Sequence, residues 1–120
     1  MSGWSLWQFD HVVDDFLSNC DQEMAAILAA KLALLSEKGN LAGMPLTKPL
    51  RKGILELRAN YRGMQPRLFF CFRSGKKIYF VHAVNKKGSQ VPNQDIELAI
   101  QRKKLIESGK VTANVIDYVN

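Results

Sequence analysis

Residues 54–85 read ILELRANYRGMQPRLFFCFRSGKKIYFVHAVN, and this stretch decides the fold. Three runs within it, at 54–60, 66–73 and 77–85, alternate their side chains between two faces, as a half-buried β-strand does. The connections at 61–65 and 74–76 each contain a glycine and have the length of hairpin loops. The sequence therefore predicts an antiparallel meander of three strands, or of four if residues 4–9 add a short first strand.

The first two runs have one apolar face and one charged face. The apolar face consists of Leu55, Leu57, Leu68, Phe70 and Phe72, and the opposite face holds Glu56, Arg58, Arg67 and Arg73. In the third run His82 alternates in register with Ile78, Phe80 and Val84, which predicts a packed histidine on an apolar face.

Helices are predicted on both sides of this stretch. Residues 11–17 and 21–38 precede it, with Asp21 as a side-chain cap and Gly39 as the stop of the longer helix. The loop at 40–49 contains Pro45 and Pro49, and a last helix is predicted from 93 to about 106 with Asn93 as its cap. We expect an α+β fold with the helices on one face of the sheet and the other face open to a ligand. The tail at 111–119 is β-prone, and its role is not assigned.

Length and composition favour one soluble domain. A chain of 120 residues with 47% hydrophobic residues fits a single domain over 1–120. No apolar run approaches the length of a membrane span, and the N-terminus does not resemble a secretory signal, so we expect a cytoplasmic protein without membrane contact. Cys20 and Cys71 are expected to be free thiols. We expect no cofactor and no metal, because the acidic residues are scattered and the cysteines are far apart in sequence.

Positive charge is concentrated in the middle of the chain. Residues 1–47 have a net charge of −4, residues 88–120 are balanced, and residues 48–87 hold eleven basic groups and one acid, Glu56, for a net charge of +10. Such an asymmetry favours a polyanionic partner, and the neighbouring aromatic residues favour unpaired RNA over DNA. The alternative is a solvated sheet face with Glu56 as an internal partner. The RNA-binding candidates are Lys48, Arg51, Lys52, Arg73, Lys76 and Lys77.

An ordered set of short motifs resembles a known family. The set comprises Gly53-Ile54-Leu55-Glu56-Leu57-Arg58, Arg67-Leu68-Phe69-Phe70, Val81-His82-Ala83-Val84-Asn85-Lys86-Lys87 and Glu97-Leu98-Ala99. Across 48–104 it is similar to the phage-derived HigB branch of the RelE/ParE toxin superfamily. The resemblance implies a type II toxin that cleaves mRNA, usually on the ribosome, and that a cognate helix-turn-helix antitoxin silences. Arg58 and Arg67 match the family's sheet-borne basic residues, and Lys86 and Lys87 match its basic turn.

Cleavage of RNA without metal needs a base for the ribose 2′-OH, charge to stabilise the phosphorane and a proton for the 5′ oxygen. The catalytic candidates are Arg58, Arg67, Lys86, Lys87 and Glu56. The base stays open between Glu56 and a lysine whose pKa neighbouring cations depress. Two other functions also stay open: a gyrase-directed toxin of the ParE type and a non-catalytic RNA-binding module.

Overall fold

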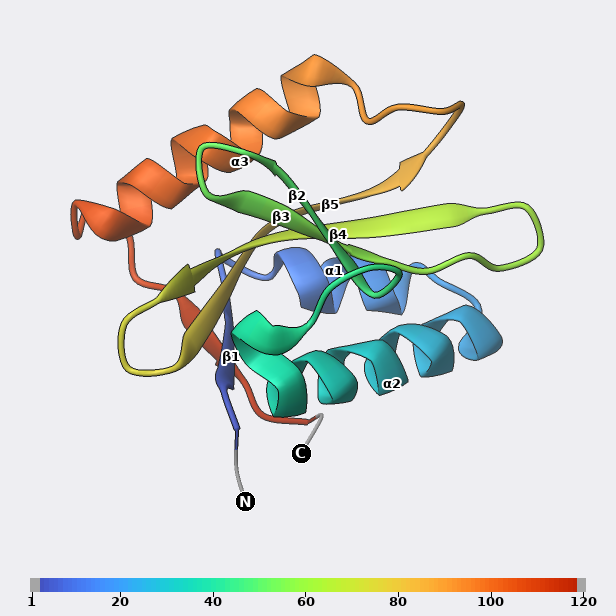
Figure 1. Cartoon of the computed structure of the whole chain (residues 1–120), viewed down its shortest axis with the longest axis horizontal. Helices are drawn as coiled ribbons and strands as arrows, with labels where there is room; N and C mark the ends of the chain where they lie inside the picture. The colour runs from blue at the N-terminus through green and yellow to red at the C-terminus, as the bar shows by residue number, and fades with distance from the viewer. Residues whose placement is uncertain (1–2, 119–120) are drawn as a thin grey trace.

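The computed structural model describes residues 3–118, and a six-stranded sheet forms the centre of this part of the chain (Figure 1). The helices are α1 (Val12–Ser18), α2 (Gln22–Lys38) and α3 (Asn93–Glu107), with a short 3₁₀ helix η1 (Gly39–Leu41) after α2. The strands are β1 (Ser5–Gln8), β2 (Thr47–Arg51), β3 (Ile54–Arg58), β4 (Gln65–Arg73), β5 (Lys77–Lys86) and β6 (Asn114–Ile116). The predicted α+β class is confirmed.

The sheet order is β2-β3-β4-β5-β1-β6, so the meander has four strands and two more extend the sheet beyond β5. β1 pairs in parallel with β5, and β6 pairs antiparallel with β1. The three predicted central strands are confirmed. The prediction of a loop at 40–49 is wrong from Thr47 onward, because β2 is an edge strand. Pro49 is tolerated there, and the register of β2 against β3 shifts just after it.

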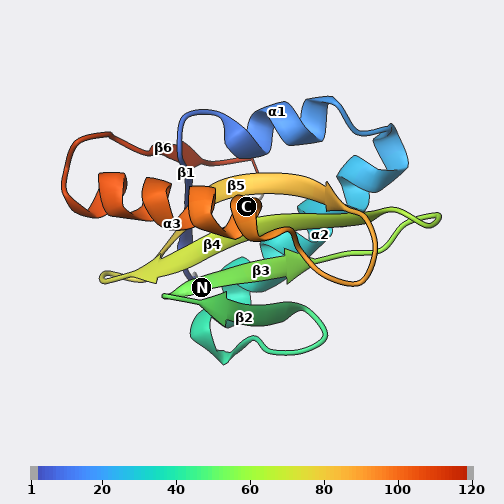
Figure 2. The same ribbon diagram turned by 90° about the horizontal axis from the view of Figure 1, so that it is seen from above.

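Helices cover both faces of the sheet, with α1 and α2 on one side and α3 on the other (Figures 1 and 2). The face under α1 and α2 is the predicted one, because it includes Leu57, Leu68, Phe70, Ile78 and Phe80. The expectation that the opposite face is open was wrong over its centre. There α3 packs Ile96, Ala99 and Ile100 against buried sheet residues, namely Ile54, Phe69, Cys71 and Val81.

An extra residue in β5 changes the facing of the strand's second half. Phe70 pairs with Phe80 and Phe69 pairs with His82, so Val81 has no counterpart in β4. A bulge of this kind reverses the alternation that follows it. His82 therefore leaves the face of Ile78 and Phe80 and turns toward α3, where its Nε2 lies 2.8 Å from Oδ1 of Asp95. The predicted facing of His82 was wrong for this reason.

The helix ends follow their local sequence in two of three cases. The carboxylate of Asp21 accepts a hydrogen bond from the Met24 backbone N–H at 2.8 Å, which confirms it as the cap of α2. Gly39, with φ +54°, directly follows the last residue of α2, as predicted. Asn93 is not a cap. It is the first residue of α3, and its Oδ1 accepts a hydrogen bond from Arg51 at 2.6 Å.

The tail acquires a role in the sheet, because β6 pairs with β1 and buries Ile116 to 1% exposure. Residue 119 of the predicted tail lies outside the described residues. Both cysteines are free, as expected, and burial raises the pKa of Cys71 to about 11. Within residues 3–118, none of the helices has the length and apolar character that crossing a membrane requires.

Two adjacent residues of β6 test how much the last strand stabilises the fold. Ile116→Ala is expected to lower the free energy of unfolding by about 2–5 kcal/mol, because it leaves a cavity beside β1. Val115→Ala is the matched control, since Val115 is 50% exposed and its loss should cost less than about 0.5 kcal/mol. Urea unfolding measures both variants. Equal effects would mean that β6 is not packed as described.

Candidate functional site

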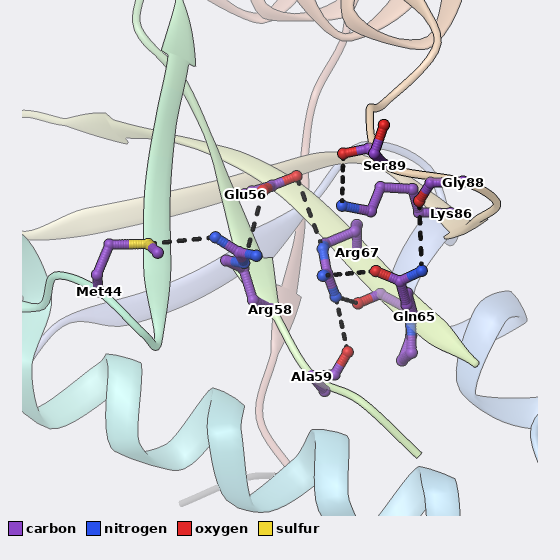
Figure 3. Close-up of polar contacts among 10 residues, drawn as sticks. Met44, Glu56, Arg58, Ala59, Gln65, Arg67, Lys86, Gly88 and Ser89 are labelled. Atoms are coloured by element: carbon purple, nitrogen blue, oxygen red, sulfur yellow. Dashed lines mark hydrogen bonds and ion pairs between the residues drawn. The ribbon is translucent and has the colours of Figure 1, made fainter. Parts of the chain in front are cut away.

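Four of the five predicted catalytic residues meet at one end of the sheet (Figure 3). Glu56 and Arg58 lie on β3, Arg67 lies on β4 and Lys86 ends β5. The strand register brings them together, because Arg58 pairs with Arg67 and Gln65 pairs with Lys86. Lys87, the fifth candidate, follows β5 directly and is exposed.

Glu56 is a buried carboxylate with cations on both sides. Its side chain is 3% exposed, with Oε2 3.7 Å from Nε of Arg58 and Oε1 3.9 Å from Nε of Arg67. Within residues 3–118, neither Oε1 of Glu56 nor Nε of Arg67 has a hydrogen-bond partner. A carboxylate in this position depends on the neighbouring positive charges, because burial without compensation is strongly unfavourable.

Arg67 points into the protein rather than to solvent. The residue is 1% exposed, and Nη1 donates hydrogen bonds to the carbonyl oxygens of Ala59 at 2.7 Å and Pro66 at 2.9 Å. Nη2 donates to Oε1 of Gln65 at 3.5 Å. The guanidinium thus connects the residue after β3 to the start of β4. Its positive charge is buried beneath the other site residues.

Lys86 is the partly buried amine of the site. Its Nζ donates a hydrogen bond to the Ser89 carbonyl at 3.4 Å. Burial lowers the pKa of Lys86, and the positive charges of Arg67, Arg58 and Lys48 lower it further, while Glu56 opposes this. A lysine with a lowered pKa is neutral more often near physiological pH and can then accept a proton.

A cleft opens beside these residues. Lys48 and Leu50 of β2 line one side, Glu56 and Lys86 contribute to its lining, and residues 89–91 with Ile96 complete the wall. The turn at 84–92 was expected to lie at the edge of the arginine face, and residues 89–91 of this turn do line the cleft, whereas Leu50 was not among the predicted site residues. The Gly88-Ser89 turn, with Gly88 at φ +79°, was the available signal for the loop, whereas nothing in the sequence distinguishes Leu50 from a core residue.

Three polar contacts from two sheet residues hold the helix that borders the cleft. Arg51 donates hydrogen bonds to Asn93 and to Glu97 of α3, and His82 contacts Asp95 in the first turn of the same helix. The start of α3 is therefore held from β2, through Arg51, and from β5, through His82; these are the strands that flank β3 and β4. Arg51, predicted to bind RNA, is engaged in this contact.

The remaining RNA-binding candidates divide into two groups. Lys48 lines the cleft, whereas Arg73, Lys76 and Lys77 lie at the other end of the β4–β5 hairpin. Along β4, Arg73 is about 20 Å from Arg67 at a rise of ~3.3 Å per residue. Lys52 lies in the β2–β3 turn near that far end and is exposed. At the far end, Arg73 lies 5.6 Å from the Tyr79 ring centre, Lys77 lies 5.4 Å from the Trp7 ring centre, and the two rings stack. The sequence predicted a single basic surface, but the basic residues form two groups, one at the cleft and one at the far end of the β4–β5 hairpin.

Removal of Arg67 tests the buried charge arrangement. Arg67→Ala is expected to lower the free energy of unfolding by about 3–5 kcal/mol, because Glu56 and two backbone carbonyls lose their partner. Arg62→Ala is the control, since the Arg62 side chain is 73% exposed in its pair with Glu23 and should contribute less than about 1 kcal/mol. Guanidinium unfolding followed by tryptophan fluorescence measures both. A small effect of Arg67→Ala would contradict the structural role.

Comparison with known proteins gives one family match. The family model described as Phage derived protein Gp49-like (DUF891) matches residues 15–104, which is three quarters of the chain. No curated protein matches the sequence significantly. The matched segment runs from α1 through α3 and contains every candidate catalytic residue. The chain therefore belongs to the phage-derived Gp49-like family, a family of toxins of toxin–antitoxin pairs with RelE-like character.

Proposed function

We propose that this chain is a type II toxin of the HigB branch that cleaves mRNA, with the ribosome presenting the substrate. The observation that carries the proposal is a cleft lined by Lys86, whose pKa is lowered, by the buried carboxylate of Glu56 and by Lys48. Arg58 lies beside this cleft, with its Nε 3.7 Å from Oε2 of Glu56. Family membership implies an antitoxin as partner, and we propose that this antitoxin is a helix-turn-helix protein. The resemblance across residues 48–104 supports the HigB assignment.

The proposed reaction is an attack of the ribose 2′ oxygen on the adjacent phosphorus. Neutral Lys86 takes the 2′-OH proton on Nζ, the 2′ oxygen forms its bond to phosphorus, and the bond from phosphorus to the 5′ oxygen breaks. Lys48, which lines the same cleft, donates the proton that the 5′ oxygen needs. The products are a 2′,3′-cyclic phosphate and a free 5′-OH, so protons and bonds balance.

Arg58 is the residue proposed to stabilise the phosphorane. Its side chain is 23% exposed, so the guanidinium reaches the surface while Glu56 holds its Nε side. Such a planar donor fits two phosphate oxygens and stays charged at every relevant pH. Arg67 and Glu56 act as positioning residues in this proposal, because both are buried. Lys87 is exposed and serves RNA binding.

A cleavage assay on ribosomes carrying a defined mRNA tests the proposal. Arg58→Ala is expected to lower the cleavage rate about 10²–10³-fold, because it removes a charged donor from the transition state. Lys104→Ala, an exposed lysine of α3, should leave the rate unchanged. Primer extension locates the cut, and naked mRNA measured in parallel shows whether the ribosome is required.

Other outcomes of that assay would select other functions. Intact mRNA together with accumulated cleaved DNA complexes would replace the proposal with a gyrase-directed toxin. Intact mRNA, intact DNA and no growth arrest would leave an RNA-binding module.

The protonation state of Lys86 predicts a pH dependence. Because the neutral amine is the base, the cleavage rate should rise with pH toward the lowered pKa of Lys86 and level off above it. Lys86→Arg keeps the positive charge but cannot lose its proton in this range, so it should lose both the activity and the rise. Single-turnover rates from pH 5 to 9 would measure this. If Lys86→Arg kept the wild-type profile, another group would be the base.

A further inference from the structure

An apolar groove lies between α2 and the segment that leads into β2. We define this α2–β2 groove by Lys31, Leu34, Lys38, Leu41, Met44 and Leu46. Leu41 is 87% exposed, Met44 is 64% exposed and Leu34 is 39% exposed, so three of the largest exposed apolar side chains gather in it. The other large exposed apolar side chains of residues 3–118, Met64, Val115 and Tyr118, do not line it. Concentrated exposure of this kind marks an interaction surface.

The charge of the groove selects the partner. Lys31 and Lys38, two ammonium groups, line the groove, and no acidic side chain does. Glu37 is adjacent to Lys38 in sequence but is not part of the lining. Two cations flanking an apolar strip fit an amphipathic helix whose apolar side covers the leucines and whose acidic side pairs with the lysines.

The groove is formed before any partner binds. Gly39, at φ +54°, packs so closely on Trp4 that an added Cβ would lie 1.8 Å from the indole nitrogen. The Ala42 N–H donates to the Gly39 carbonyl, and the Thr47 N–H donates to the Gly43 carbonyl, both at 3.1 Å. A surface already held in this way loses little conformational entropy when it binds.

The groove contacts the candidate functional site through Arg58. Nη1 of Arg58 donates a hydrogen bond to Sδ of Met44 at 3.2 Å (Figure 3). The Arg58 backbone N–H donates to the Leu46 carbonyl at 2.9 Å. Met44 is thus exposed to the groove on one side and in contact with Arg58 on the other. A helix that covers Met44 must either fix or displace the Arg58 guanidinium.

From these contacts we infer that the α2–β2 groove binds an acidic amphipathic helix of the antitoxin and that this helix controls Arg58 through Met44. The inference rests on the proposed function for the identity of the partner. The antitoxin then silences the toxin by binding beside the cleft rather than inside it. The antitoxin then does not need to fill the basic cleft in order to silence the toxin.

The test uses the protein encoded beside this chain's gene as the partner. Leu41→Glu and the pair Lys31→Glu with Lys38→Glu are expected to weaken its binding at least about tenfold, by loss of apolar contact and by charge repulsion. The matched controls are Val115→Glu and the pair Lys104→Glu with Lys110→Glu, which change exposed residues outside the groove. Calorimetry on the full-length chain measures the affinities. Circular dichroism confirms that each variant is folded.

The growth readout separates this inference from the proposed function. The groove variants should still arrest growth, while the partner no longer relieves the arrest; the control variants should be relieved as the wild type is. A wild-type chain that neither arrests growth nor cuts mRNA would refute the proposed function, yet weakened binding of the groove variants would still support the groove. Unchanged affinity of the groove variants, no binding by the wild type, or loss of self-association in their place would overturn the inference.

Discussion

The buried carboxylate of Glu56 is the constraint on which the site depends. It lies between Arg58 and Arg67 at separations of 3.7 and 3.9 Å, in a position from which water is almost excluded. Removing such a group from water is costly, and the two neighbouring guanidinium groups offset the cost. Arg67 can be buried for the same reason, because Glu56 and the carbonyls of Ala59 and Pro66 compensate its charge. Stability and site geometry are therefore set by the same three side chains.

The arrangement also explains why one lysine differs from the others. Lys86 is the last residue of β5, which pairs with β4, and it is therefore held close to the buried guanidinium of Arg67. At the far end of the hairpin Lys76 is exposed, and Lys77 lies against the Trp7 ring. Lys86 is thus the lysine of the candidate site whose pKa is lowered, first by burial and then by the neighbouring cations.

Much of this could be predicted from the sequence where local pattern decides structure. The alternation in β3 and β4 placed Leu57, Phe70, Glu56 and Arg58 on their correct faces, and Asp21 was correctly identified as a cap. The pattern failed where distant residues decide. The bulge at Val81 leaves no mark in the sequence, so His82 was assigned to the wrong face. The burial of Arg67 depends on backbone carbonyls that it reaches at Ala59 and Pro66, and the position of α3 over the sheet is encoded by no local motif.

The position of α3 determines which part of its sheet face stays open to solvent. Because α3 covers the centre of its face, the cleft that Glu56 and Lys86 line opens beyond the N-terminus of α3, where Arg51 and His82 hold the helix. The open surface is thus reduced from a whole sheet face to a cleft. In the proposed function this cleft would hold a single phosphate, whereas an open basic face would bind RNA without selecting a bond to cut. The helix that contradicted the expected open face is therefore also what makes a cleavage site physically reasonable.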